Sequence, residues 1–185
     1  MIYVIDHEDS FTYNLVHLLE GFAPTYVSNY YDINWHQLEK SKIIIFSPGP
    51  GNPSHYPETQ KVYKKYKGDK KIIGICLGFQ QILYAENADI VPQKKIYHGY
   101  QSKIKALKES TLFKPNKVFL AGRYHSLKLK EPFNSLSLKI TMRCVESNVA
   151  MAIEDTINNV YGFQFHPDSF LTVDGKFLIQ KVLQL

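Results

Sequence analysis

Two apolar runs that lack alternating polarity limit the possible folds of this chain most strongly. Residues 42–47 read KIIIFS and residues 71–76 read KIIGIC, and a glycine follows each run within two residues. A strand with one face in solvent alternates apolar and polar residues, whereas a parallel strand between two layers of helices is apolar throughout. The two runs therefore predict inner strands of a parallel sheet that is covered on both faces.

The rest of the pattern predicts strands that alternate with helices before residue 90 and shorter strands after it. Apolar residues at helical spacing predict a first helix that starts from an N-cap at Asp9 or Ser10 and closes at Gly21. Further strands are expected at 2–5, 25–29, 102–107, 117–122, 136–144, 149–154 and 160–165, and further helices at 59–67, 79–85 and 174–185. This order predicts a flavodoxin-like, doubly wound α/β fold, with a mostly parallel sheet and a smaller antiparallel excursion, in a single domain over residues 1–185.

Composition agrees with one compact domain. The chain has 185 residues, 44% of them hydrophobic, which suits a single α/β core. No basic leader stands before an apolar segment, and no apolar run reaches the ~18–20 residues that cross a bilayer. Two cysteines argue against a disulfide framework and for a reducing compartment, so we expect a cytoplasmic protein that has no membrane partner.

The positive charge of the chain does not indicate nucleic acid. The net charge of +5 comes almost entirely from lysine, because Arg123 and Arg143 are the only arginines. The densest basic run, KKYKGDKK at residues 64–71, lies at an expected helix-to-strand junction and is typical of a solvated surface. Arginines interleaved with aromatic residues and zinc-type Cys/His spacing are both missing. We therefore expect no nucleic-acid partner and no metal site.

Cys76 stands in the segment GICLG, at the expected carboxyl end of an inner strand. Open α/β sheets bind ligands at this edge. The pattern Gly-x-nucleophile-x-Gly is typical of a nucleophile elbow, and a helix that starts directly after the cysteine favours the thiolate. The pentapeptide alone is equally compatible with a buried structural cysteine. Cys144, in TMRCVES, has no such context and is expected to be structural.

A thiolate nucleophile usually has a histidine partner that a third group orients. Among seven histidines, His166 stands in a pattern that supplies the third group locally, FQFHPDSF. In an extended segment His166 and Asp168 point to the same side, and Pro167 stiffens the backbone between them. A solvated turn is the alternative, but together with the elbow the pattern favours a Cys76–His166–Asp168 triad.

These motifs together resemble class I, triad-type glutamine amidotransferases. The resemblance rests on GICLG with Gln80, SPGPG at 47–51, RYHSL at 123–127 and GFQFHPDS at 162–169. The segments DHEDSFTYNL at 6–15 and HGYQS at 98–102 narrow it to the amidotransferase subunits of anthranilate synthase and aminodeoxychorismate synthase. The motifs cover essentially the whole chain in the same order, so the resemblance implies the class I amidotransferase fold.

The resemblance implies a role for each matching residue. Cys76 attacks the carboxamide of L-glutamine, His166 transfers protons and Asp168 orients His166. Backbone N–H groups of Gly51 and Leu77 form the oxyanion hole. The substrate is held by Gly49, Pro50, Gly51, Gln80, Ser126 and Leu127. The reaction needs no cofactor, and the ammonia goes to a chorismate-binding synthase on a separate chain. For His125 we expect a packing or hydrogen-bonding role, not a catalytic one.

The sequence departs from the family pattern in three places. Asp168 replaces the usual Glu and is shorter by one C–C bond, about 1.5 Å. Phe79 replaces a histidine that is common after the elbow, and MAIED at 151–155 replaces a glycine and a basic pair. Two alternatives therefore stay open: another Cys-His hydrolase of the same fold, such as a γ-glutamyl hydrolase or peptidase, and a regulatory subunit with a decayed triad. The sequence leaves the choice between anthranilate and aminodeoxychorismate synthesis open.

Overall fold

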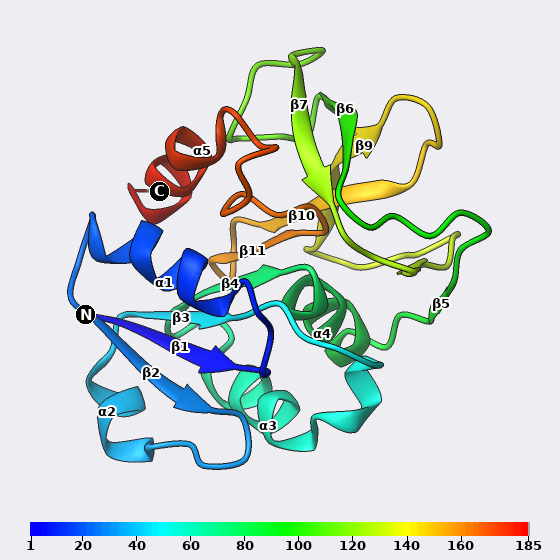
Figure 1. Ribbon diagram of the computed structural model, residues 1–185. Coiled ribbons are helices and arrows are strands. Elements are labelled where there is room, and N and C mark those ends of the chain that lie inside the picture. The colour runs from blue at the N-terminus through cyan, green and yellow to red at the C-terminus, as the bar shows by residue number, and fades with distance from the viewer. Residues whose placement is uncertain (185) are drawn as a thin grey trace.

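The computed structural model describes residues 1–184 and contains a central nine-stranded mixed sheet (Figure 1). The strand order is β2-β1-β3-β4-β11-β10-β9-β6-β7. Leu185, the last residue of the predicted domain and of the predicted last helix, lies outside the described residues. The order of the parallel strands is that of a flavodoxin-like sheet, which confirms the predicted doubly wound fold.

The parallel half of the sheet contains the two apolar runs. It consists of β1 (Ile2–Asp6), β2 (Thr25–Asn29), β3 (Ile43–Phe46), β4 (Lys71–Ile75) and β11 (Val160–Phe163). β3 and β4 lie side by side in parallel at its centre, and β11 pairs in parallel with the other edge of β4. The inner, fully covered position of the two runs is therefore confirmed.

The antiparallel excursion extends the same sheet. It consists of β10 (Ala150–Asp155), β9 (Lys139–Cys144), β6 (Tyr100–Ala106) and β7 (Val118–Arg123). Two three-residue strands, β5 (Ile90–Pro92) and β8 (Leu127–Leu129), form a separate small sheet that the sequence pattern did not predict. Three-residue strands carry too little periodicity to be recognised.

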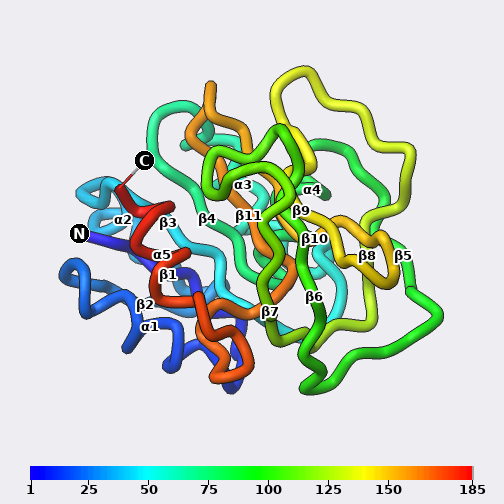
Figure 2. The backbone as a smooth tube through the Cα atoms, turned by 90° about the horizontal axis from the view of Figure 1, so that it is seen from above, coloured from blue at the N-terminus to red at the C-terminus, as the bar shows by residue number. Residues whose placement is uncertain are grey.

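Helices cover both faces of the parallel strands. On one face, α1 (Thr12–Glu20) and α5 (Gly175–Gln184) pack against strand residues such as Val4 and Ile45 (Figures 1 and 2). On the other face, α2 (Trp35–Lys40), α3 (Pro57–Tyr66) and α4 (Leu77–Ala85) pack against Tyr3 and Ile44. Successive strand residues point to opposite faces, so each strand contributes to both apolar cores.

Several element boundaries differ from those predicted. The N-cap of α1 is Phe11, not Asp9 or Ser10, because the Asp9 carboxylate instead accepts a hydrogen bond from the Phe11 N–H at 2.8 Å. The end at Gly21 is confirmed. The helices predicted at 59–67 and 79–85 both begin two residues earlier, and the exposed α2 and a 3₁₀ turn (Pro53–His55) were not predicted.

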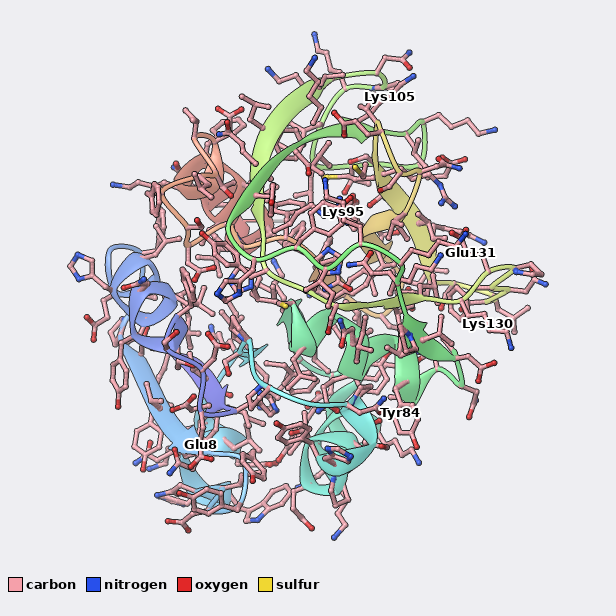
Figure 3. The ribbon with its side chains drawn as sticks, turned by 45° about the vertical axis from the view of Figure 1, so that its right-hand side comes forward. Glu8, Tyr84, Lys95, Lys105, Lys130 and Glu131 are labelled. Atoms are coloured by element: carbon pink, nitrogen blue, oxygen red, sulfur yellow. The ribbon has the colours of Figure 1, made fainter. Side chains whose placement is uncertain are left out.

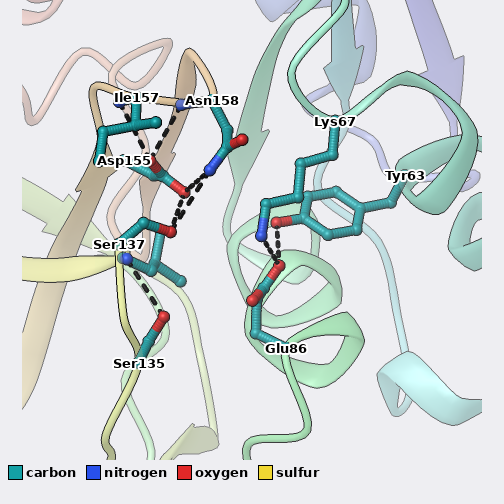
Figure 4. A network of polar contacts seen from close by, with 9 residues as sticks. Tyr63, Lys67, Glu86, Ser135, Ser137, Asp155, Ile157 and Asn158 are labelled. Atoms are coloured by element: carbon teal, nitrogen blue, oxygen red, sulfur yellow. Dashed lines mark hydrogen bonds and ion pairs between the residues drawn. The ribbon is translucent and has the colours of Figure 1, made fainter.

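Polar contacts stabilise the region around the C-terminal end of α4, which is the end far from Cys76. Glu86, which follows α4, accepts hydrogen bonds from the Tyr63 hydroxyl and from Lys67, each at 2.6 Å (Figure 4). Nearby, Asp155 accepts from Ser137 and from Asn158. Lysines project into solvent over much of the remaining surface, including Lys95, Lys105 and Lys130 (Figure 3).

Candidate active site

Cys76 occupies a strained turn between β4 and α4. Its backbone dihedrals are φ 52° and ψ −99°, which a non-glycine residue rarely adopts. The turn is possible because the glycines on either side allow close packing. A Cβ atom on Gly74 would lie 2.3 Å from the carbonyl oxygen of Gly78, and one on Gly78 would lie 2.2 Å from that of Phe46. The geometry is that of a nucleophile elbow, with the sulfur at the N-terminus of a helix.

The loop that contains the sequence SPGPG passes close to this turn and is anchored from behind. A Cβ atom on Gly49 would lie 2.6 Å from the side chain of Leu77, so the loop and the first residue of α4 are in contact. The Ser47 hydroxyl accepts from the His7 N–H at 2.8 Å, and the Tyr56 hydroxyl donates to the Pro50 carbonyl at 2.7 Å. These contacts hold the loop at the carboxyl edge of the sheet.

A cavity of about 240 Å³ opens between the elbow, this loop and the segment after β7. Cys76, Leu77 and all six residues that the resemblance assigns to substrate binding line it. The full lining is Asp9, Gly49, Pro50, Gly51, Cys76, Leu77, Gln80, Tyr124, His125, Ser126 and Leu127. Asp9, Tyr124 and His125 were not predicted as lining residues, although all three lie inside the quoted motifs.

The two residues matched to the oxyanion hole, Leu77 and Gly51, both line this cavity. Leu77 is the first residue of α4, so its N–H has no partner within the helix. Gly51 has φ +76°, a left-handed conformation that favours glycine. A cavity lined by both residues is suited to an oxyanion.

His166 and Asp168 lie next to each other, and both side chains are almost completely buried. Nδ1 of His166 is 3.6 Å from Oδ1 of Asp168, which is longer than a hydrogen bond. Within residues 1–184, neither ring nitrogen of His166 and neither carboxylate oxygen of Asp168 has a hydrogen-bond partner. The rings of Phe11 and Tyr124 flank the imidazole at centroid distances of 5.1 and 4.9 Å. His166 and Asp168 are therefore neighbours, but no hydrogen bond joins them.

The electrostatics of His166 connect it to Cys76. Burial of the imidazole favours its neutral form, but the negative charge of the Cys76 sulfur and the Asp168 carboxylate outweigh burial and raise the pKa of His166 to about 10. The imidazole therefore favours its charged form, and a positive charge close to a cysteine is a feature of reactive cysteines.

His125 has a structural role in the wall of the cavity. Its Nε2 accepts from the Nε–H of Arg123 at 3.0 Å, so the proton is on Nδ1, which donates to the Leu127 carbonyl at 2.8 Å. Burial and the neighbouring guanidinium lower the pKa of His125 to about 3 and keep the ring neutral. His125 thereby positions the segment that carries Ser126 and Leu127.

The sequence interpretation overlooked Gln164. Its side chain is fully buried and lies between Gln80 and the Cys76 sulfur. The signal was available, because the spacing that places Asp168 beside His166 also places Gln164, two residues earlier, on the same side of the extended segment.

The rest of the described chain offers no comparable set of reactive side chains. A larger hollow, of about 560 Å³, lies between residues 86–89 and 130–134. Its charged side chains are paired: Lys130 with Asp89, Glu86 with Lys67 and Glu131 with Arg143. Residues 1–184 contain no group of three or more His, Cys, Asp or Glu side chains that could hold a metal ion. No helix in this part of the chain has the length and hydropathy of a membrane span.

Comparison with known proteins agrees with this geometry. The family model of class I glutamine amidotransferases matches residues 3–185. The chain is 36% identical to anthranilate synthase component 2 of Lactococcus lactis, over 97% of this chain and 92% of that protein. It is 40% identical to anthranilate synthase component 2 of Pyropia yezoensis, over 100% of this chain and 99% of that protein.

Solved structures share the fold at much lower identity. A Thermoplasma acidophilum protein described as a GMP synthase subunit has a TM-score of 0.84 at 19% identity, over 99% of this chain and 92% of that one. A glutamine amidotransferase of Thermotoga maritima has a TM-score of 0.75 at 13% identity, over 99% and 96% of the two chains. The motifs, the fold and the match along nearly the full length agree: the chain belongs to the class I glutamine amidotransferase family.

Proposed function

We propose that residues 1–185 form one amidotransferase domain that hydrolyses L-glutamine and delivers the ammonia to a chorismate-binding synthase on a separate chain. One observation carries the proposal: a single cavity is lined by Cys76 in its strained elbow, by Leu77 and Gly51, and by the residues matched to glutamine binding. Its volume of about 240 Å³ suits a small amino acid.

The chemistry follows from these positions. The Cys76 thiolate adds to the side-chain carbonyl carbon of glutamine, and the N–H groups of Leu77 and Gly51 stabilise the oxyanion. The imidazolium of His166 protonates the departing nitrogen, which leaves as ammonia and produces a glutamyl thioester. The neutral imidazole then takes a proton from water, the hydroxide adds to the thioester, and the C–S bond breaks to give glutamate and the thiolate. Asp168 orients His166 in both steps.

The names of the relatives support the choice of partner. The relatives described above are named anthranilate synthase component 2. We therefore assign the ammonia to anthranilate synthesis in the first place, with aminodeoxychorismate synthesis as the other reaction of a chorismate-binding synthase. Both cysteines are free and buried, which suits a cytoplasmic enzyme. Co-purification of the bound synthase from the native cell extract decides between the two products.

Replacement of the nucleophile tests the proposal. Cys76→Ser should abolish glutamine-dependent synthesis in the assembled complex, because a neutral hydroxyl is a far weaker nucleophile than a thiolate. Synthesis from added ammonium should persist, because the synthase performs that step. Cys144→Ser, at the other buried cysteine, should retain both activities.

A glutamine-analogue electrophile provides the second measurement. It should label Cys76 in the unsubstituted protein and leave Cys144 unmodified. Labelling that fails at Cys76 would support a decayed triad. Hydrolysis of γ-glutamyl conjugates without hydrolysis of free glutamine would support the other hydrolase, and equal loss of both synthetic activities in Cys76→Ser would mean that Cys76 is structural.

A further inference from the structure

The side chain of Gln164 lies directly against the reactive sulfur. Its Nε2 is 3.8 Å from Sγ of Cys76. The position follows from the register of the sheet: β11 pairs in parallel with β4 so that Phe163 lies opposite Ile75, and the next residues of the two segments are Gln164 and Cys76. The backbone N–H of Gln164 donates to the Met151 carbonyl at 2.9 Å, so the main chain cannot shift freely.

Gln80 fixes the direction of the Gln164 carboxamide. Nε2 of Gln80 donates to Oε1 of Gln164 at 3.1 Å, which turns the NH₂ group of Gln164 toward the sulfur. Gln80 lies one helical turn after Cys76, and its backbone N–H donates to the Cys76 carbonyl at 3.2 Å. A chain of two amides therefore runs from the wall of the cavity to Sγ.

An N–H group in this position acts on the charge of the sulfur. A thiolate accepts a hydrogen bond much better than a thiol, so a fixed donor favours the charged form. Cys76 is only 6% exposed, and Gln164 is not exposed at all, so little water reaches the sulfur from this side. The carboxamide takes the place of that water.

We propose that Gln164 is a further catalytic residue, which donates an N–H to the Cys76 thiolate and is held in that orientation by Gln80. The donor stabilises the resting thiolate and the thiolate that returns when the C–S bond of the thioester breaks. The inference rests on the proposed function, because it assigns a role in the same reaction.

The test is the pH dependence of Cys76 alkylation by iodoacetamide, followed on the Cys76 peptide by mass spectrometry in the full chain. Gln164→Met keeps the size of the side chain and removes the donor. It should move the midpoint of the rate profile upward by about one pH unit, so that alkylation is about tenfold slower below both midpoints. Gln164→Glu replaces the donor with a negative charge and should move the midpoint further.

The other titratable groups near the sulfur are the same in all variants and cancel in the comparison. They are Asp9 after β1, His55 beside Gly51, Tyr124 and His125 after β7, and His166 and Asp168 after β11. Gln81→Met is the matched control. Gln81, in α4, is fully buried like Gln164, but its side chain is hydrogen-bonded to Gln60. Its profile should coincide with that of the unsubstituted protein.

Two results would overturn the proposal. One is a Gln164→Met profile that coincides with that of the unsubstituted protein. The other is a Gln164→Glu protein that reacts faster at low pH. If both variants fail to fold, Gln80→Met decides, because it releases the carboxamide and should raise the midpoint, and an unchanged midpoint overturns the proposal.

Alkylation needs no glutamine turnover, so this test is separate from that of the proposed function. Glutaminase activity of the unsubstituted chain with its synthase is measured in parallel. Activity with an unchanged Gln164 profile rejects only the role of Gln164. A shifted profile without any glutaminase activity rejects only the proposed reaction.

Discussion

At the scale of single residues, the gap between His166 and Asp168 is the feature with the clearest consequence. The two groups are 3.6 Å apart, and neither carboxylate oxygen of Asp168 has a hydrogen-bond partner within residues 1–184. Burial of a carboxylate without hydrogen bonds is unfavourable. The shorter side chain of Asp, in place of the usual Glu, gives a direct reason for the gap.

Substitutions at position 168 test the orienting role. Asp168→Asn should lower the glutaminase turnover of the synthase complex by about tenfold or more. The amide stabilises the charged form of His166 less well than the carboxylate does, and it disturbs the tautomer of the neutral ring. Asp168→Glu adds about 1.5 Å of reach, enough to close the gap, so it should retain or raise turnover. Asp174→Asn, on the same loop, is the control. Unchanged turnover in both the Asn and the Ala variants would remove Asp168 from the triad.

His7 gives the stability of the protein a defined pH dependence. It is fully buried and bonded to Ser47 and Thr59, and burial lowers its pKa to about 3. The unfolded chain binds a proton at His7 below about pH 6.5 and the folded chain does not. The contribution of His7 is therefore complete above about pH 6.5 and is lost as the pH falls from there toward 3.

The slope of this loss is measurable by urea unfolding between pH 4.5 and 7.5. Protonation of His7 in the unfolded chain should lower the unfolding free energy by about 1.4 kcal/mol for each pH unit between about 6.5 and 3. His7→Asn should reduce the slope by that amount, whatever its effect at neutral pH. His36→Asn, at an exposed histidine of α2, should leave the slope as it is. An unchanged slope in His7→Asn would contradict the neutral, buried state of the ring.

At the scale of elements, the contact between α4 and the strands beneath it determines where the nucleophile stands. α4 starts directly after Cys76, and its Gly78 lies against the backbone of β3 at Phe46. A side chain at position 78 would push the helix away from the sheet and move the sulfur with it. The elbow therefore depends on helix packing as much as on its own turn.

Gly78→Ala should be strongly destabilising. The new Cβ would lie 2.2 Å from the Phe46 carbonyl oxygen, a backbone atom that cannot move aside. We expect a loss of about 1–3 kcal/mol or more of unfolding free energy by denaturant titration. Gly21→Ala is the matched control, since its nearest contact is an ordinary 3.4 Å, and it should change stability by less than about 1 kcal/mol. Equal stability of both variants would mean that α4 can retreat from β3 without cost.

At the scale of the whole molecule, the loop that carries Asp168 connects the active site to a distant segment. Thr172 donates to the His166 carbonyl at 2.6 Å, and Gln101 of β6 donates to the Leu171 carbonyl at 2.8 Å. Gln101 belongs to the HGYQS segment, which we propose, together with residues 9–11, as part of the synthase contact. A shift of this segment when the synthase binds would thus move the loop that carries His166 and Asp168.

We therefore predict that the isolated chain is a weak glutaminase and that the synthase, and then chorismate, raises its activity. Each oxyanion donor brought into place contributes roughly 10²–10³ in rate. The measurement is steady-state glutaminase activity of the chain alone, with synthase, and with synthase plus chorismate. Full activity of the chain alone, unchanged by either addition, would reject gating and favour a free-standing hydrolase.

The sequence by itself determined the parallel core of the protein and where its chemistry stands in the chain. Continuous apolar runs are stable only between two covering layers, so β3 and β4 were predictable from residues 42–47 and 71–76 alone. The elbow and the His166–Asp168 spacing follow from local stereochemistry, because neighbouring residues along an extended chain have fixed directions. Short exposed elements such as α2 and β5 were missed, since their stability comes from tertiary contacts.

Only the tertiary structure decided which distant groups meet. Gln164 lies beside Cys76 because β11 pairs with β4 in one particular register, across 88 residues of chain. His7 supports the loop at Ser47 because β1 and β3 are neighbours in the sheet. The 3.6 Å distance between His166 and Asp168 depends on how the two side chains pack, because a change of one bond length decides whether they form a hydrogen bond. Local sequence restricts backbone directions, whereas strand register and packing distances are properties of the whole folded chain.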